Sequence, residues 1–176
     1  MLDILAYYHV LFIIVLTIIY NFNQWRKVVW LITFFTFWHT LSLTLAAYDI
    51  VHVPIKIVEF LIPVTICTTG IFNLLRPSSP SSRKQKTIFS FALFFGLIHG
   101  LGFARYFKII IPKDEIEFSL FSFALGVELD QIAIVVLVLI SSFFIIRILR
   151  RSKNSWEFLV GAMILSQALG MILERI

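Results

Sequence analysis

Long apolar runs separated by short polar segments dominate this chain, and the pattern predicts membrane-spanning helices. Six such runs occur, at about residues 4–20, 28–47, 55–75, 87–107, 118–146 and 156–173. A helix needs roughly 20 apolar residues to cross a bilayer, and these runs are too long and too uniformly apolar for barrel strands. We therefore predict an all-α polytopic membrane helix bundle in which residues 1–176 form a single transmembrane domain.

The segment at residues 76–86 is the longest polar stretch, and its proline and serine content is typical of a linker that divides the runs three and three. Ten lysines and arginines fall in the first, third and fifth loops, against five on the opposite side. Because positively charged loops stay in the cytoplasm, we predict a cytoplasmic linker at 76–86 and both termini on the outer side.

Composition agrees with this class, since 60% of the residues are hydrophobic against 45–50% in soluble domains. The formal charge of +5 is explained by the basic loops, so no nucleic-acid partner is predicted. The single cysteine, Cys67, permits no internal disulfide. The 19 phenylalanines are interpreted as lipid-facing bulk that carries no cofactor argument.

Six ionisable side chains interrupt the apolar runs. They are His9, His39, Glu59, His99, Glu128 and Asp130. A charged group at the centre of a span costs about 2.5–3.5 kcal/mol on insertion scales, so such groups indicate a functional site. At a rise of about 1.5 Å per residue, all six lie roughly 8–18 Å below the outer ends of their runs. One layer of polar groups favours a shared pocket that opens outward.

Glycines surround one of these histidines. Gly96 and Gly100 lie on one helical face beside His99, although glycine costs about 1 kcal/mol relative to alanine inside a helix. We therefore expect another helix, or a bound ion, to approach the backbone at this point.

Local spacing adds two candidate supporting residues, Ser42 and Gln131. Ser42 follows His39 by three residues, so its hydroxyl can support the histidine or bond its own backbone. Gln131 likewise shares a face with Glu128.

Asp130 is about 200° around the helix from Glu128, so the two carboxylates cannot meet at one centre without a bend. Gly126 is where such a bend is expected.

Three imidazoles with carboxylates match the ligands of nickel, cobalt, zinc, manganese or iron(II). A permease would bind such a cation from the outer side through His9, His39, His99 and Glu128, with Glu59 and Asp130 carrying charge nearby. Alternatively, the histidines would hold the catalytic metal of an intramembrane hydrolase or transferase. Glu128 or Asp130 would then be the base acting on an outer-leaflet lipid, lipoprotein or membrane peptide.

Weaker interpretations stay open beside these two. Buried histidines also bridge helices in structural membrane subunits, and Glu59 lies three residues after Lys56, as expected of a surface ion pair. The expected partners are the bilayer and a metal ion, with a homo-oligomer or a larger membrane complex left open.

Several segments are similar to one family. They are Tyr7–Phe12, Trp38–Leu45, Val58–Glu59, Phe95–Ala104 and Gly126–Gln131. The sequence resembles the HupE/UreJ family of small bacterial membrane proteins, which accompany hydrogenase and urease genes and are assigned as nickel or cobalt permeases. The resemblance implies a nickel or cobalt permease in the bacterial inner membrane. Leu2 and Tyr8 stand where family members commonly carry a histidine and an aspartate, and Asp130 stands where glycine is usual.

Overall fold

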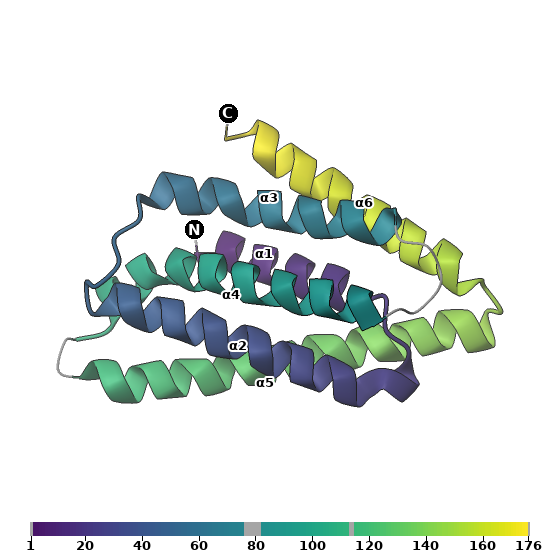
Figure 1. Cartoon of the computed structure of the whole chain (residues 1–176), viewed down its shortest axis with the longest axis horizontal. Helices are drawn as coiled ribbons and strands as arrows, with labels where there is room; N and C mark the ends of the chain where they lie inside the picture. The colour runs from purple at the N-terminus through teal and green to yellow at the C-terminus, as the bar shows by residue number, and fades with distance from the viewer. Residues whose placement is uncertain (1, 76–81, 113–114, 176) are drawn as a thin grey trace.

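The structure, a computed structural model, describes residues 2–75, 82–112 and 115–175. This part of the chain is 87% helical and contains no strand, which confirms the predicted all-α helix bundle. The six helices are shown in Figure 1; they are α1 (Leu2–Thr17), α2 (Trp25–Ala47), α3 (Ile55–Leu74), α4 (Ser82–Ile110), α5 (Ile116–Phe143) and α6 (Lys153–Leu173). A 3-10 turn, η1 (Phe22–Gln24), precedes α2, and a π turn, η3 (Phe144–Ile148), extends α5.

Five of these helices, α2 to α6, are long and apolar enough to cross a membrane. The exception is α1, whose 16 residues rise only about 24 Å. The predicted linker falls partly on residues 76–81, which lie outside the described residues. Residues 82–86 belong to the beginning of α4 rather than to a loop.

Although it is the shortest helix, α1 lies in the middle of the bundle, in contact with α3, α4, α5 and α6 (Figure 1). Phe12, Ile13 and Val15 have no exposed surface. A helix that is apolar on every side is expected in a protein core or in lipid, and most of α1 lies in the core of the bundle. Every polar side chain on α1 is therefore held inside the protein from at least Tyr8 onwards.

The α2 and α4 helices form the most extensive pair in the bundle because glycines let their backbones approach. A Cβ atom at Gly100 would lie 2.1 Å from both the carbonyl oxygen of His39 and the hydroxyl oxygen of Ser42. A Cβ atom at Gly96 would lie 2.8 Å from the carbonyl oxygen of Phe35. The expected close approach of another helix beside His99 is thus confirmed.

Inside α3, Pro63 has no N–H group, so it cannot donate to the carbonyl oxygen of Glu59 four residues earlier. Arg175 supplies the missing donor through Nη1, at 2.9 Å from that oxygen. The guanidinium also lies 5.1 Å from the centre of the Tyr8 ring. This contact joins the residues after α6 to both α3 and α1.

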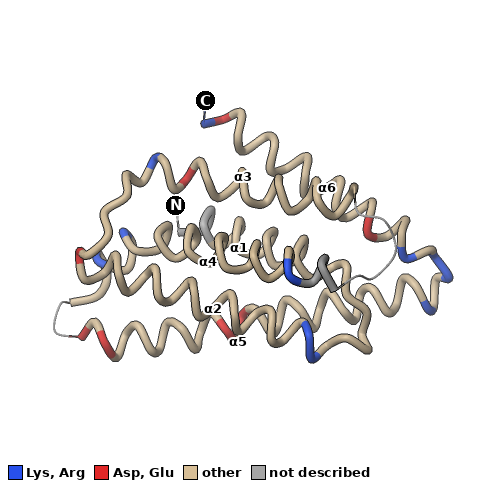
Figure 2. Tube along the Cα trace, viewed as in Figure 1, with Lys and Arg blue, Asp and Glu red and all other residues tan. Residues whose placement is uncertain are grey.

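The two ends of the bundle differ in charge. We name them the α4–α5 end and the α5–α6 end, after the connections that they contain. Figure 2 shows lysine and arginine gathered around the connection from α5 to α6. This cluster includes Arg147, Arg150, Arg151 and Lys153. This excess of basic residues is the reason that we predict a cytoplasmic α5–α6 end. The orientation of the chain in the membrane stays a prediction.

A candidate metal centre of three histidines

Three of the four histidines come together in the core of the bundle, each from a different helix. His9 lies on α1, His39 on α2 and His99 on α4, and all three are buried. The ring centroid of His9 lies 5.9 Å from that of His39 and 6.1 Å from that of His99. Because α1 is central and α2 packs tightly on α4, the fold brings together residues that are 90 positions apart.

The hydrogen bond of His99 fixes which of its ring nitrogens is available. Nδ1 lies 2.8 Å from the carbonyl oxygen of Phe95, one turn earlier in α4. A carbonyl oxygen can only accept, so Nδ1 carries the hydrogen and Nε2 keeps a lone pair. Nε2 is buried and has no hydrogen-bond partner in the described part of the chain. Metal-binding histidines almost always have this arrangement.

Gln131 connects His9 to the rest of the core from α5. Its amide nitrogen lies 3.0 Å from Nε2 of His9, and its amide oxygen accepts a 3.1 Å hydrogen bond from the hydroxyl of Thr36 on α2. Gln131 is fully buried, so these contacts satisfy an amide that would otherwise be costly. They also fix the tautomer of His9, because an amide that donates to Nε2 leaves the ring hydrogen on Nδ1.

Four imidazole nitrogens in this cluster are buried without a partner among the described residues. They are Nδ1 of His9, both ring nitrogens of His39 and Nε2 of His99. An unsatisfied buried polar group costs about 1–3 kcal/mol. Several such groups within one cluster favour a ligand that completes them.

Aromatic rings enclose the three histidines. The Phe12 and Phe35 rings are fully buried, with centroids 5.1 Å and 5.9 Å from that of His99. The rings of Phe103 and Phe123 lie 5.6 Å and 6.1 Å from that of His39. The interpretation of the phenylalanines as lipid-facing bulk is therefore wrong for this group, because these rings form the apolar wall of the histidine cluster.

The carboxylates predicted as ligands occupy different places. One oxygen of Glu128 accepts a 2.6 Å hydrogen bond from the hydroxyl of Thr33, and the other is buried without a partner among the described residues. Asp130 is exposed on another side of α5, which runs as a helix through Gly126. Glu59 lies near the beginning of α3. Within the described residues, no group of three His, Cys, Asp or Glu side chains has the geometry of a ready metal site.

Two alternatives left open by spacing are resolved by side-chain contacts. Ser42 donates a 3.0 Å hydrogen bond to the carbonyl oxygen of His39, so it bonds its own backbone while it packs against Gly100. Within the described part of the chain, Glu59 forms no ion pair with Lys56. Thr33 and Thr36 were not selected from the sequence. Their spacing of three residues from one another, and of Thr36 from His39, is the signal that marks them.

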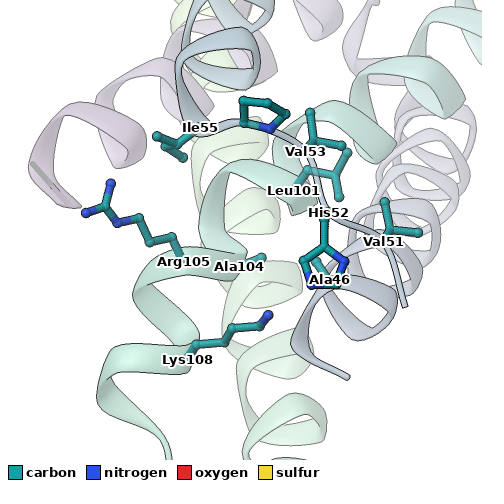
Figure 3. A pocket seen from close by; sticks show the side chains of 10 residues that line it. Ala46, Val51, His52, Val53, Ile55, Leu101, Ala104, Arg105 and Lys108 are labelled. Atoms are coloured by element: carbon teal, nitrogen blue, oxygen red, sulfur yellow. The ribbon is translucent and has the colours of Figure 1, made fainter. Parts of the chain in front are cut away.

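The fourth histidine lies outside the cluster, in a basic pocket of about 480 Å³ at the α4–α5 end (Figure 3). His52 and Lys108 extend toward the same space, and both contact the Asp49 carboxylate. The hydrogen bond from Lys108 is the main reason that the pKa of Asp49 lies below its usual value. The contact between Lys108 and Asp49 beside this pocket joins the α2–α3 connection to α4.

Comparison with known proteins places the chain in a family. The profile of the HupE / UreJ protein family matches residues 4–175, nearly the whole chain. This chain belongs to the HupE/UreJ family. The family is associated with nickel and cobalt transport. No curated protein and no solved structure matches the chain. Because the HupE/UreJ match covers all six helices, the cluster of three histidines lies inside the region that defines membership.

Proposed function

We propose that this HupE/UreJ protein is a membrane permease for a divalent transition metal of the nickel or cobalt class, located in a bacterial inner membrane. His9, His39 and His99 bind the cation. The observation that carries the proposal is the bond from Nδ1 of His99 to the Phe95 carbonyl, which leaves Nε2 as a buried, unpartnered ligand atom.

Binding requires the rings to turn. Two nitrogen ligands on one ion lie no more than about 4 Å apart, because each metal–nitrogen bond is about 2.0–2.1 Å long. The ring centroid of His9 lies about 6 Å from those of His39 and His99. The rings would therefore turn on binding. His9 would also give up its bond to Gln131 at Nε2, or move its ring hydrogen from Nδ1, so that a lone pair faces the cation. A site completed only when the cation arrives binds it weakly enough to release it, as transport requires.

Glu128 is the carboxylate best placed to join the histidines. It shares a face of α5 with Gln131, which contacts His9. Its second oxygen has no partner to exchange in the described structure, so approach to a cation costs no existing hydrogen bond. A carboxylate beside three neutral imidazoles would offset half of the charge of a divalent ion.

A permease also needs polar atoms between the cluster and the α5–α6 end, and three buried threonines on α1 and α3 are candidates for this role. Thr65 and Thr69 follow one another by a turn on α3, and Thr17 lies on α1. All three hydroxyls are buried and donate to carbonyl oxygens of their own helices. Their oxygens keep lone pairs that accept from a hydrated ion.

Uptake by proteoliposomes tests the proposal. Purified protein would be reconstituted with a Ni²⁺-sensitive dye inside the vesicles, and the initial rate of uptake would be compared among the wild type, His39→Ala, His99→Ala and His52→Ala. We expect loss of flux in the first two variants. His52→Ala is the matched control, because it removes a histidine that lies outside the cluster.

The result that overturns the permease is a wild-type rate equal to that of empty vesicles, for Ni²⁺ and Co²⁺ alike. Metal analysis then separates the remaining functions. An enzyme would retain about one ion per chain through purification, and His99→Ala would lose that ion. A structural subunit would retain none and would tolerate both substitutions.

A further inference from the structure

Two cavities adjoin along α5 and lead to the histidine cluster. The first, of about 400 Å³, lies between α4 and α5 toward the α4–α5 end, and the second, of about 350 Å³, lies between α1, α4 and α5. Phe103 and Phe123 line both cavities, so the two adjoin at these rings. We name the combined space the α5 groove.

The two walls of the α5 groove differ in chemistry. Aromatic and aliphatic side chains of α4 form one wall. The oxygen-bearing side chains on the α5 side are Glu115, just before the helix, and Ser119, Ser122 and Asp130 within it. They lie among apolar α5 side chains such as Phe118, Val127 and Leu137. The groove therefore offers a few oxygen atoms between the end of the bundle and the middle of α5.

Asp130 is the feature that most requires an explanation. It is exposed, and it forms no hydrogen bond or ion pair with any residue that the structure describes. It lies 14 residues beyond the beginning of α5, about 21 Å along the helix. A carboxylate at that depth is costly in hydrocarbon, so it needs water or a cation beside it.

His9 closes the deep end of the α5 groove. It is 8% exposed and lines the same cavity as Asp130. Its Nδ1 atom is one of the buried nitrogens without a partner among the described residues. One cavity is thus lined by a histidine with one unbonded ring nitrogen, from α1, and by a carboxylate with no partner among the described residues, from α5.

We propose that the α5 groove is the hydrated route by which a divalent cation reaches His9 from the α4–α5 end, with Asp130 as the carboxylate that binds it immediately before His9. This inference rests on the proposed permease function and specifies its access path. Phe103 and Phe123 lie between the groove and His39, with ring centroids 5.6 Å and 6.1 Å from its ring. They separate the arriving cation from the second histidine until the rings turn aside.

Cysteine labelling tests the route without requiring transport. In a Cys67→Ala background, Ser122→Cys and Ala133→Cys place thiols in the α5 groove, whereas Leu125→Cys places one on an exposed face of α5 that does not line it. A cationic, membrane-impermeant methanethiosulfonate reacts with thiolates in water. We expect both groove positions to react at least about tenfold faster than Leu125→Cys. Equal, slow rates at all three positions overturn the route.

A second arm tests Asp130 itself. Ni²⁺ bound there would repel the cationic reagent, so it should slow labelling of Ala133→Cys, and Asp130→Asn should abolish this protection. Protection that survives Asp130→Asn overturns the role of Asp130. In the uptake assay, Asp130→Asn should raise the half-saturating Ni²⁺ concentration about tenfold without lowering the maximal rate.

The uptake assay and the labelling assay test different claims. Absence of wild-type uptake overturns the permease, whatever the labelling shows. Slow labelling in the groove of a chain that does take up Ni²⁺ overturns only the route.

Discussion

The guanidinium of Arg175 donates a 2.9 Å hydrogen bond to the main-chain carbonyl oxygen of Glu59, the group that Pro63 leaves without a donor in α3. The same guanidinium lies over the ring of Tyr8 on α1. One charged side chain thus satisfies a defect in one helix and fixes the position of another. Tyr8 directly precedes His9, so this contact also supports the histidine cluster.

Arg175→Met should lower the free energy of unfolding by about 1.5–3 kcal/mol, because it removes a hydrogen bond from a charged donor. In a Pro63→Ala background the cost should be smaller, because residue 63 then supplies an N–H group to the Glu59 carbonyl. A double-mutant cycle of thermal or denaturant unfolding in detergent measures this difference. Equal costs in the two backgrounds would show that Arg175 acts through Tyr8 alone.

Gly100→Ala should destabilise the protein by at least about 3 kcal/mol, because the new methyl group would lie 2.1 Å from main-chain and side-chain oxygens of α2. Since the clash falls on His39, bound Ni²⁺ should be lost as well. The matched control is Gly126→Ala, where a Cβ atom meets nothing within 4 Å. The free energy of unfolding of that variant should equal the wild-type value or exceed it by up to about 1 kcal/mol. Equal melting temperatures for the two variants would contradict the packing of α2 on α4.

Gln131→Leu should reduce Ni²⁺ affinity by about 10–100-fold, because His9 loses the amide that holds its ring in the cluster. Isothermal titration of the detergent-purified protein measures the affinity. Gln167→Leu, on an exposed position of α6, makes the same chemical change away from the cluster and should bind as the wild type does. If both variants bound Ni²⁺ equally well, Gln131 would have only a packing role.

The ion pair between Lys108 and Asp49 should stabilise the folded protein to a degree that depends on pH. Because Lys108 holds the pKa of Asp49 below its usual value, the contribution is fully present above the ordinary carboxyl pKa, and it disappears as pH falls through the lowered value. The wild type should therefore melt at a higher temperature than Lys108→Gln at pH 7. The difference should shrink below about pH 4. If the difference in melting temperature between the wild type and Lys108→Gln stayed the same from pH 7 to pH 3, this ion pair would be excluded as a source of stability.

The sequence was sufficient for the helix bundle and for three members of the cluster. Apolar runs of span length predict helices from local composition alone, and a histidine inside such a run is costly enough to stand out. The Gly96 and Gly100 pair predicted a close helix contact because glycine has no other advantage inside a helix. These inferences need only residues that are near one another in the chain.

The arrangement around the histidines could not be predicted, because it depends on which helices are neighbours. Glu128 bonds Thr33 while Gln131 bonds Thr36, and spacing along α5 cannot decide between such partners on α2. The aromatic enclosure was missed for a similar reason. Phe12 and Phe35 resemble lipid-facing phenylalanines until the central position of α1 is known.

The central position of α1 also constrains how the protein is made. This helix is synthesised before α3 to α6, which supply most of its contacts. With about 24 Å of helix against a hydrocarbon core of about 30 Å, α1 is poorly matched to lipid until those neighbours arrive. His39 meets His99 only after α4 has been inserted, and Gln131 reaches His9 only with α5. Assembly of the histidine cluster is thus coupled to the insertion of α4 and α5. Under the proposed function, a chain that stops before α4 would not hold the cation.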